Sequence, residues 1–232
     1  MLNKLKTLTG LWKDLGPFNT ALYLLHRILS GPSRGRAGIE RFIFVAQPVP
    51  AETHLPANKS VQSAVKRLNP DDPLLTQCQR PAAVIAARFA QGAICLAIIK
   101  GDQLQGSIWL IERHYDEDVV RARFVLPASG KAVWDFDVYV APKYRLGFTF
   151  LKLWDAANAH IRERGACWTF SRITAFNLGS LASHTRLGAR PFGSATFLTL
   201  GQIQIMVSNL APKLHISFGK ARPELLLPDY IA

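Results

Sequence analysis

The sequence predicts an α/β fold of the α+β kind, with a mixed, mainly antiparallel central sheet that is flanked by helices. Two observations lead to this prediction. Strand-like runs separated by short turns occupy roughly residues 93–140, a pattern typical of an antiparallel meander. From residue 141 to residue 188 the pattern changes to helix, strand and helix. The two halves together indicate one sheet with mixed strand directions.

The individual elements follow from hydrophobic periodicity and turn residues. A strand begins at Arg41 and ends at prolines, and a helix is expected near residues 60–68. A helix over 178–187 has Asn177 as its N-cap and Gly188 at its end. The other expected elements are strands at 93–100, 105–113, 119–126, 132–140 and 167–175, a helix at 146–164, a hairpin at 194–208 around Gly201, and a strand at 215–218.

Length and composition favour one large domain, or one domain with an appendage. The chain has 232 residues, 49% of them hydrophobic, and a formal charge of +12. We divide it into a basic amphipathic helical extension and linker, 1–38, and a main domain, 39–232. The charge suggests an acidic partner, such as nucleic acid, anionic lipid, a phosphorylated cofactor or an acidic carrier protein. The alternative is a basic surface that only aids solubility.

Residues 1–30 are predicted to form two short helices that are interrupted at Gly16-Pro17. Two interpretations of this segment are open. It lies on a membrane surface with its apolar face down and its lysines at the headgroups, or the apolar stripe packs on the protein or on a partner. Residues 31–38 have the composition of a linker. The apolar stripe of the first helix consists of Leu2, Leu5, Leu8, Trp12 and Leu15.

Neither a membrane span nor a cleavable signal peptide is expected, because the apolar runs are far shorter than the ~20 residues that a span needs and the N-terminal apolar residues are spaced. The three cysteines, Cys78, Cys95 and Cys167, form no CxxC pair, which argues against a zinc or dithiol site. Their pattern favours a reduced, cytoplasmic setting. We expect the cytoplasm, or its membrane surface if residues 1–30 bind there.

Three local motifs stand in order along the chain: VYVAPKYR at 138–145, RLGFTF at 145–150 and NLGSLASHTRLGA at 177–189. Together they resemble the GNAT superfamily of acyltransferases, and the resemblance covers roughly residues 90–210. It implies that strand amides bind the pantetheine arm and acyl carbonyl of acetyl-CoA or another acyl-CoA, and that the following turn binds the pyrophosphate. The donor-binding residues that the resemblance implies are Val138, Tyr139 and Val140 for the amides, Arg145, Leu146, Gly147 and Phe148 for the turn, and Asn177 at the start of the helix at 178–187.

The chain departs from the family pattern at two places. Phe148 and Phe150 stand where the family has glycines, so their bulk blocks the usual pyrophosphate pose, or the turn is remodelled around Gly147 with the phenylalanines facing the core. His184 stands where the family has a Tyr that protonates the departing thiolate. An imidazole can do the same work, because its reference pKa of ~6.5 suits proton transfer at neutral pH. The alternative is an ordinary surface histidine.

A general base is sought among carboxylates near the expected acyl carbonyl. Asp135 and Asp137 alternate with Trp134 and Phe136, so both acids are predicted to project from one face of the strand. Burial or mutual repulsion would raise one of their pKa values. Glu112 is the reserve candidate. Family members often use a bound water instead, and an exposed face with solvated acids is the structural alternative.

The sequence therefore predicts an acyltransferase that moves an acyl group directly from a thioester to an amine or hydroxyl acceptor. One alternative is an enzyme that takes its acyl group from an acyl carrier protein. Another is a degenerate GNAT-like module that binds a membrane surface or a protein partner. Nucleic acid binding ranks last, because the basic residues are dispersed. The acidic run at 114–118 is interpreted as a solvated hairpin loop rather than a metal site, and no GxSxG or P-loop motif is present.

Overall fold

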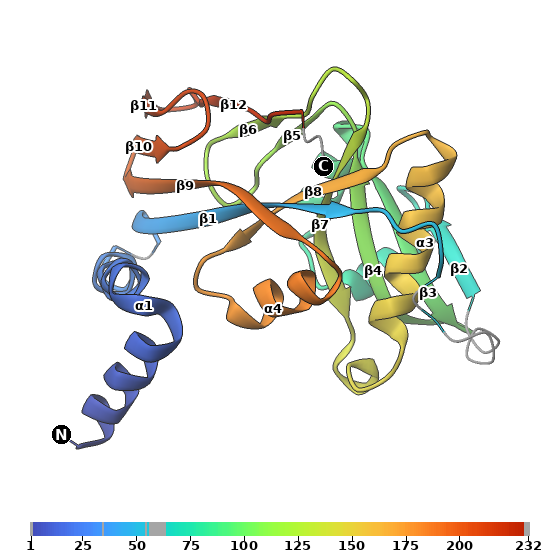
Figure 1. Ribbon diagram of the computed structural model, residues 1–232, viewed down its shortest axis with the longest axis horizontal. Helices are drawn as coiled ribbons and strands as arrows, with labels where there is room; N and C mark the ends of the chain where they lie inside the picture. The colour runs from blue at the N-terminus through green and yellow to red at the C-terminus, as the bar shows by residue number, and fades with distance from the viewer. Residues whose placement is uncertain (1, 34, 54, 56–63, 230–232) are drawn as a thin grey trace. The chain divides into compact units, whose positions relative to one another are not determined.

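Figure 1 shows a computed structural model of the chain, which describes residues 2–33, 35–53, 55 and 64–229, with backbone only for residues 2–8. The chain divides into two compact units. The first comprises Met1–Gln47, Glu117–Phe124 and Arg172–Leu227, and the second comprises Pro48–Asp116, Val125–Ser171 and Pro228–Ala232. The predicted division at residue 38 stays a prediction.

The first unit contains an antiparallel sheet with the strand order β11-β10-β9-β1. The predicted hairpin around Gly201 is confirmed, since Ile203 of β10 pairs with Leu200 of β9. The helices are α1 (Leu2–Ser30) and α4 (Leu178–Arg186). The strands are β1 (Ala37–Pro48), β9 (Arg190–Leu200), β10 (Ile203–Ser208), β11 (Leu214–Phe218), β12 (Glu224–Leu226) and most of β6 (Arg123–Val125).

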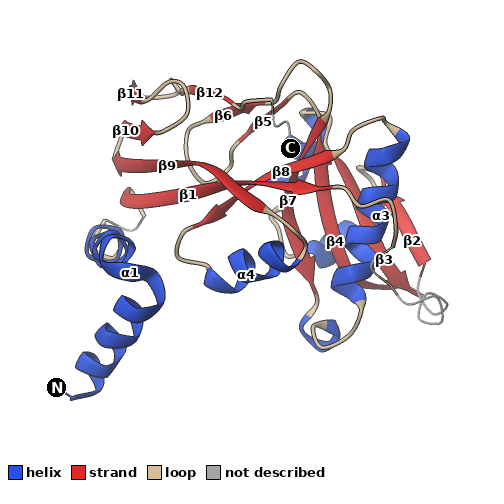
Figure 2. Cartoon of the chain, in the orientation of Figure 1, coloured by secondary structure: helices blue, strands red, loops and turns tan. Residues whose placement is uncertain are grey.

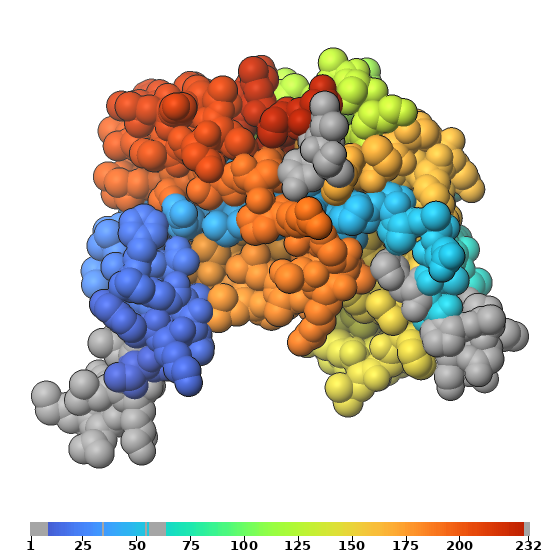
Figure 3. Space-filling view, viewed as in Figure 1, coloured from blue at the N-terminus to red at the C-terminus, as the bar shows by residue number. Residues whose placement is uncertain are grey.

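Helix α1 is two helices joined at a kink, as the sequence predicted. Gly16 has φ 74° and ψ 168°, a conformation outside the helical region that glycine adopts without steric cost. Pro17 then begins the second part, where its missing N–H is tolerated. Figures 1 and 3 show α1, in blue, next to β1, and its second part contacts that strand: Nδ1 of His26 lies 2.8 Å from the carbonyl oxygen of Ile39, and the guanidinium of Arg41 lies 5.0 Å from the ring centre of Phe18. No described helix is both long enough and apolar enough to cross a bilayer.

In the second unit the sheet order is β8-β7-β4-β3-β2, antiparallel except for the parallel pair β7 and β8. Its strands are β2 (Ala64–Leu68), β3 (Ile94–Lys100), β4 (Gln103–Ile111), β5 (His114–Asp116), β7 (Ala132–Val140) and β8 (Trp168–Thr174), the last of which runs on into the first unit. Its helices are α2 (Ala82–Ala90), α3 (Thr149–Glu163) and two short 3₁₀ turns, η2 (Pro73–Cys78) and η3 (Pro142–Tyr144).

Helix α3 lies against β3, β4 and β7, and Figure 2 shows it, in blue, beside these strands. Its buried residues include Leu153, Trp154 and Ile161. Gly106 of β4 lets the helix approach closely: a Cβ at this position would lie 2.6 Å from the carbonyl oxygen of Tyr139 and 2.9 Å from Cδ1 of Leu153. Any larger residue would therefore push the helix and β7 apart.

Three predicted elements differ from the structure. Ala64–Leu68 is strand β2 rather than the end of a helix, and residues 60–63 lie outside the described residues. The strand predicted at 119–126 is reduced to β6, which lies beside β12 in a small separate sheet. As a result β4 pairs directly with β7, and the segment between them leaves the meander. The predicted helix at 146–164 begins only at Thr149, because the preceding residues form a turn.

Candidate functional site

Strands β7 and β8 separate at a defined point. Their parallel ladder runs from Ala132 opposite Trp168 to Trp134 opposite Phe170, whereas β7 continues to Val140. On its other edge β7 stays paired with β4, with Tyr139 opposite Ser107. One edge of the second half of β7 therefore has no ladder to β8 in the described pairing. The predicted amide donors Val138, Tyr139 and Val140 all lie in this half.

A β-bulge interrupts β7 in the same region. Trp109 pairs with Phe136 and Ser107 with Tyr139, so two residues of β7 oppose one residue of β4. Asp137, one of the two, has φ 49°, in the left-handed region. The bulge breaks the alternation of side chains. The prediction that Asp135 and Asp137 project together from one face is therefore wrong, and their neighbours differ completely.

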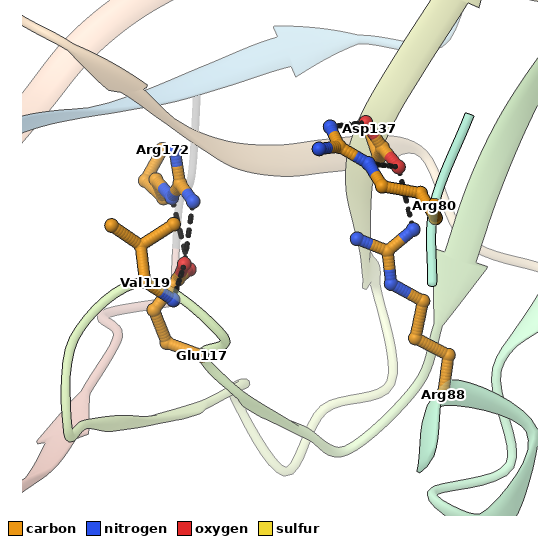
Figure 4. Close-up of polar contacts among 6 residues, drawn as sticks. All are labelled: Arg80, Arg88, Glu117, Val119, Asp137 and Arg172. Atoms are coloured by element: carbon orange, nitrogen blue, oxygen red, sulfur yellow. Dashed lines mark hydrogen bonds and ion pairs between the residues drawn. The ribbon is translucent and has the colours of Figure 1, made fainter. Parts of the chain in front are cut away.

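Asp137 is bound by two arginines, as Figure 4 shows. Arg80 donates from Nε to Oδ2 at 2.8 Å and forms a second bond to Oδ1, and Arg88 donates from Nη1 to Oδ2 at 2.5 Å. Arg88 is 3% exposed and its guanidinium lies 5.3 Å from the ring centre of Trp109 and 5.1 Å from that of Phe136. Burial raises the pKa of Asp137, but the two arginines outweigh it and hold the pKa below its usual value. Asp137 is therefore a fixed anion and a weak base.

Asp135 has the opposite character. It is 1% exposed, and burial raises its pKa to about 7, although the nearby hydroxyls of Thr169 and Ser171 lower it in part. Its Oδ1 atom has no hydrogen-bond partner among the described residues. The residue directly follows the last rung of the β7–β8 ladder. It is thus a carboxyl group whose pKa suits proton exchange at neutral pH, at the point where the two strands separate.

The predicted phosphate-binding turn links η3 to α3. Nε of Arg145 donates to the carbonyl oxygen of Val140 at 3.1 Å, and the amide of Gly147 donates to the carbonyl oxygen of Tyr144 at 3.1 Å. Leu146 is fully exposed. The two phenylalanines behave differently, because Phe148 is 41% exposed whereas Phe150 packs edge-on against Trp154.

Phe148 occupies the N-cap position of α3 and provides no side-chain cap. The side chain at the N-cap position therefore accepts no hydrogen bond from the first amides of α3. The helix that these amides begin is fifteen residues long. Such amides favour an anion. Phe150 is half-buried against the buried Trp154, whereas Phe148 is exposed, so the alternative in which both phenylalanines face the core is not met.

Asn177 and His184 lie in the first unit, and the other predicted site residues lie in the second. Asn177 caps α4 as predicted, since its Oδ1 accepts a hydrogen bond from the amide of Ser180 at 3.0 Å, and Gly188 ends the helix with φ 85°. His184 is 6% exposed, so the alternative of a surface histidine is wrong. Burial lowers its pKa to about 4, and the imidazole is therefore neutral at pH 7.

The acidic segment at 114–118 is not the solvated loop that the sequence suggested. Its first three residues form β5, and the side chain of Glu117 is fully buried. Glu117 accepts hydrogen bonds from Nε of Arg172 at 2.9 Å and from its own neighbour, the amide of Val119, at 3.1 Å (Figure 4). The reserve base Glu112 is about half exposed and forms an ion pair with Arg164. Each of the two carboxylates is thus held in an ion pair with an arginine, and the role of Glu112 as a base stays a prediction.

Sequence reasoning overlooked Arg80 and Arg88. A signal for Arg88 is present in AAVIAARFA, because one arginine in an otherwise apolar helix needs a buried partner. No comparable local signal exists for Arg80, which approaches Asp137 from the loop before α2. The carboxylate that both arginines bind is 57 residues from Arg80 and 49 from Arg88.

The order of elements from β3 to β10 is that of the GNAT fold that the motifs predicted: antiparallel strands, a central strand, a turn, a long helix, a strand, a short helix and a final hairpin. No family model and no curated protein matches the sequence. The chain is similar to a solved structure of a conserved protein of unknown function from Staphylococcus epidermidis, with a TM-score of 0.51 and 10% identity over 75% of this chain and 67% of that one.

Two further similar structures are described as GNAT proteins. One is an acetyltransferase of this family from Novosphingobium aromaticivorans, with a TM-score of 0.49 and 16% identity over 69% of this chain and 64% of that one. The other is a tandem GNAT protein of the clavulanic acid biosynthesis pathway, with a TM-score of 0.47 and 14% identity over 73% of this chain and 58% of that one. The chain thus spans about two thirds or less of the lengths of these structures. At such identities the likeness concerns the fold alone.

Proposed function

We propose that the protein is an acyltransferase that moves an acyl group directly from a thioester donor, acetyl-CoA or another acyl-CoA, to an amine or hydroxyl acceptor. One observation carries the proposal: β7 parts from β8 immediately before a strand segment with a bulge, and a buried carboxyl group with a pKa of about 7 stands at the point of separation. In the described pairing, the arrangement offers a strand edge beyond the end of the β7–β8 ladder and a proton acceptor within a few residues of each other.

In the proposed reaction, the acceptor nitrogen or oxygen attacks the thioester carbonyl carbon while amides of Val138, Tyr139 or Val140 bind the developing oxyanion. The acceptor loses a proton, and we assign Asp135 as the group that takes it, directly or through a water. Asp137 is unsuited to this step, because two arginines hold its pKa low. The C–S bond then breaks, and the thiolate takes up a proton and leaves as a thiol.

Two predicted roles remain proposals. Arg145, with the turn residues Leu146, Gly147 and Phe148, would bind the donor phosphates beside the first amides of α3. His184 would return the proton to the thiolate. Because its pKa is about 4, only about one molecule in a thousand carries the imidazolium at pH 7, so this role needs a donor that raises the pKa on binding.

Donor binding can be measured by thermal unfolding with acetyl-CoA. A ligand at about 100 times its Kd stabilises the native state by about 2.7 kcal/mol, which for a chain of this size raises Tm by roughly 5–10 °C. We expect this rise in the wild type and in Arg190→Gln, an exposed control on β9, and its loss in Arg145→Gln. A rise with an acyl carrier protein alone would select the carrier-dependent alternative. No rise with either donor would refute the proposal.

A second candidate function, peripheral binding to an anionic membrane surface, is favoured by the first unit. Leu214, Ile216 and Phe218 alternate along β11 and are 62, 66 and 67% exposed. They pair with Val207, Ile205 and Ile203 of β10, so the six apolar residues share one face of the sheet. In α1, Trp12, Phe18 and Ile28 are also more than half exposed. Exposed apolar surface of this extent is typical of an interaction site.

Charge supports the same candidate. The first unit contains 15 of the chain's 28 Lys and Arg residues but only 5 of its 16 Asp and Glu residues, an excess of ten positive charges. Cosedimentation with vesicles of phosphatidylglycerol, compared with phosphatidylcholine, tests the candidate. We expect binding to the anionic vesicles only, and its loss in the double variant Ile216→Ser, Phe218→Ser but not in Val65→Ser, an exposed position of the second unit. Equal pelleting of all three proteins would exclude this face.

A further inference from the structure

A hollow of about 210 Å³ lies in the second unit, at the end of β4 and beside the last turn of α3. Ionisable side chains from separate parts of the chain line it: Arg67 of β2, Arg113 just after β4, His160 of α3 and Arg164 just after α3, with Glu112 as the acidic residue. A larger hollow of about 750 Å³ shares Arg113 and Arg164 with it and has an apolar wall that includes Val125, Leu126, Pro127 and Ala166. The two hollows are therefore adjacent.

Positive charge in the smaller hollow is not balanced. Glu112 is paired with Arg164, through a contact of 3.1 Å between Nη2 and Oε2 among others. Among the described residues, no carboxylate forms an ion pair with Arg67 or Arg113. The net effect is visible at His160, whose pKa is lowered by burial and by the charges of Arg164 and Arg67, although the carboxylates of Glu163 and Glu112 raise it in part. Cations that converge without counter-charges repel each other, and an anion would relieve that repulsion.

The backbone at Arg113 supplies an independent observation. Arg113 has φ 69°, in the left-handed region, which costs a residue with a side chain roughly 1–2 kcal/mol. The conformation is held from outside, since the carbonyl oxygen of Arg113 accepts a hydrogen bond from the amide of Leu126 at 2.7 Å. Strain that the surrounding structure maintains is concentrated at binding sites. Here it places a guanidinium at the wall that the two hollows share.

We propose that these adjacent hollows bind an organic anion, with a carboxylate or phosphate head between Arg67 and Arg113 and an apolar portion along Val125 and Leu126. The site is distinct from the proposed donor turn. That turn precedes the N-terminus of α3, whereas His160 and Arg164 stand at its C-terminus, about 20 Å away by the rise of a fifteen-residue helix. The ligand is thus a second one, and its binding does not depend on acyl transfer.

Proton NMR of the His160 ring tests this proposal, with the resonance assigned from a His160→Gln variant. The probes are butyl phosphate, inorganic phosphate and sodium chloride at equal ionic strength. We expect butyl phosphate to raise the pKa of His160 in a saturable way, because a bound anion favours the imidazolium. Inorganic phosphate should bind at least fivefold more weakly, since it lacks the apolar portion, and chloride should have no saturable effect.

Variants locate the effect. Arg67→Gln and Arg113→Gln should each weaken butyl phosphate binding at least fivefold, whereas Arg190→Gln, a matched loss of one exposed charge, should leave it unchanged. Arg145→Gln should also leave it unchanged, which separates this site from the donor turn. An equal response to chloride, or equal affinity in Arg113→Gln and Arg190→Gln with both folded by their amide spectra, would overturn the proposal. Equal affinity for the two phosphates would remove the apolar portion from it.

Discussion

Replacement of Asp135 by Asn should make the protein more stable at alkaline pH and less active at the same time. The carboxyl is 1% exposed and burial raises its pKa from 3.8 to about 7. Between these two values the native protein binds more protons than the unfolded chain, so stability falls as pH rises through this window. Each pKa unit corresponds to 1.36 kcal/mol, so the full cost of the ionised group above pH 7 is about 4 kcal/mol.

An amide at position 135 carries no charge and removes this cost. The new N–H groups need acceptors, for which the hydroxyls of Thr169 and Ser171 are available, so we expect a net gain of about 2–4 kcal/mol at pH 8. At pH 5 only the part of this cost that accumulates between pH 3.8 and pH 5 destabilises the wild type. The gain from Asp135→Asn at pH 5 should therefore be about 2–3 kcal/mol smaller than at pH 8. Urea unfolding of both proteins at the two pH values measures the difference.

Asp71→Asn is the matched control, because Asp71 is exposed and its replacement should change stability equally little at both pH values. The reasoning is refuted if Asp135→Asn gains nothing at pH 8, or gains the same amount at pH 5. Activity provides the second readout. A lost general base lowers turnover by about 10²–10⁴-fold. Unchanged turnover in the more stable variant would make Asp135 a buried structural group and move the proton transfer elsewhere.

Three further outcomes are expected. Asp137→Asn should lower the free energy of unfolding at pH 7, measured by urea unfolding, by about 3 kcal/mol, because it leaves Arg88 buried without its anion. A loss smaller than that of Arg80→Gln, at a half-exposed arginine, would contradict this. Gly106→Ala should cost about 1–3 kcal/mol by overpacking against Tyr139, and an unchanged urea midpoint would speak against the close contact. The Tm of the wild type should fall as pH falls from 6.5 through 4, because native His184 stays neutral while the unfolded imidazole binds a proton. The Tm of His184→Gln, measured by thermal unfolding, should fall less over the same range.

The sequence predicted those elements whose causes are local. Gly16-Pro17 interrupts α1, Asn177 caps α4, and turns at Gly101 and Gly201 close hairpins, each through the conformational properties of one or two residues. Hydrophobic periodicity identified most of the strands and helices between them, but it missed α2 and gave a helix where β2 lies. The order of elements followed, and with it the fold class.

Features that depend on distant residues were not predictable. A bulge shifts β7 by a single residue at Asp137, and a pattern of period two gives no sign of it. The burial of Glu117, just before the shortened strand β6, depends on Arg172, 55 residues along the chain. Burial shifts the pKa values of Asp135 and His184, and nothing in the sequence around either residue shows that its side chain is buried.

The geometry at position 137 has a consequence for descendants of this protein. The backbone there adopts φ 49°, which Gly, Asn and Asp tolerate best, whereas the two arginines beside it require a carboxylate. Aspartate alone satisfies both demands. A lineage that loses Asp137 must then lose or neutralise the buried Arg88 as well, so these positions should be inherited as a set. Their joint presence in a diverged chain would mark common ancestry more reliably than overall identity.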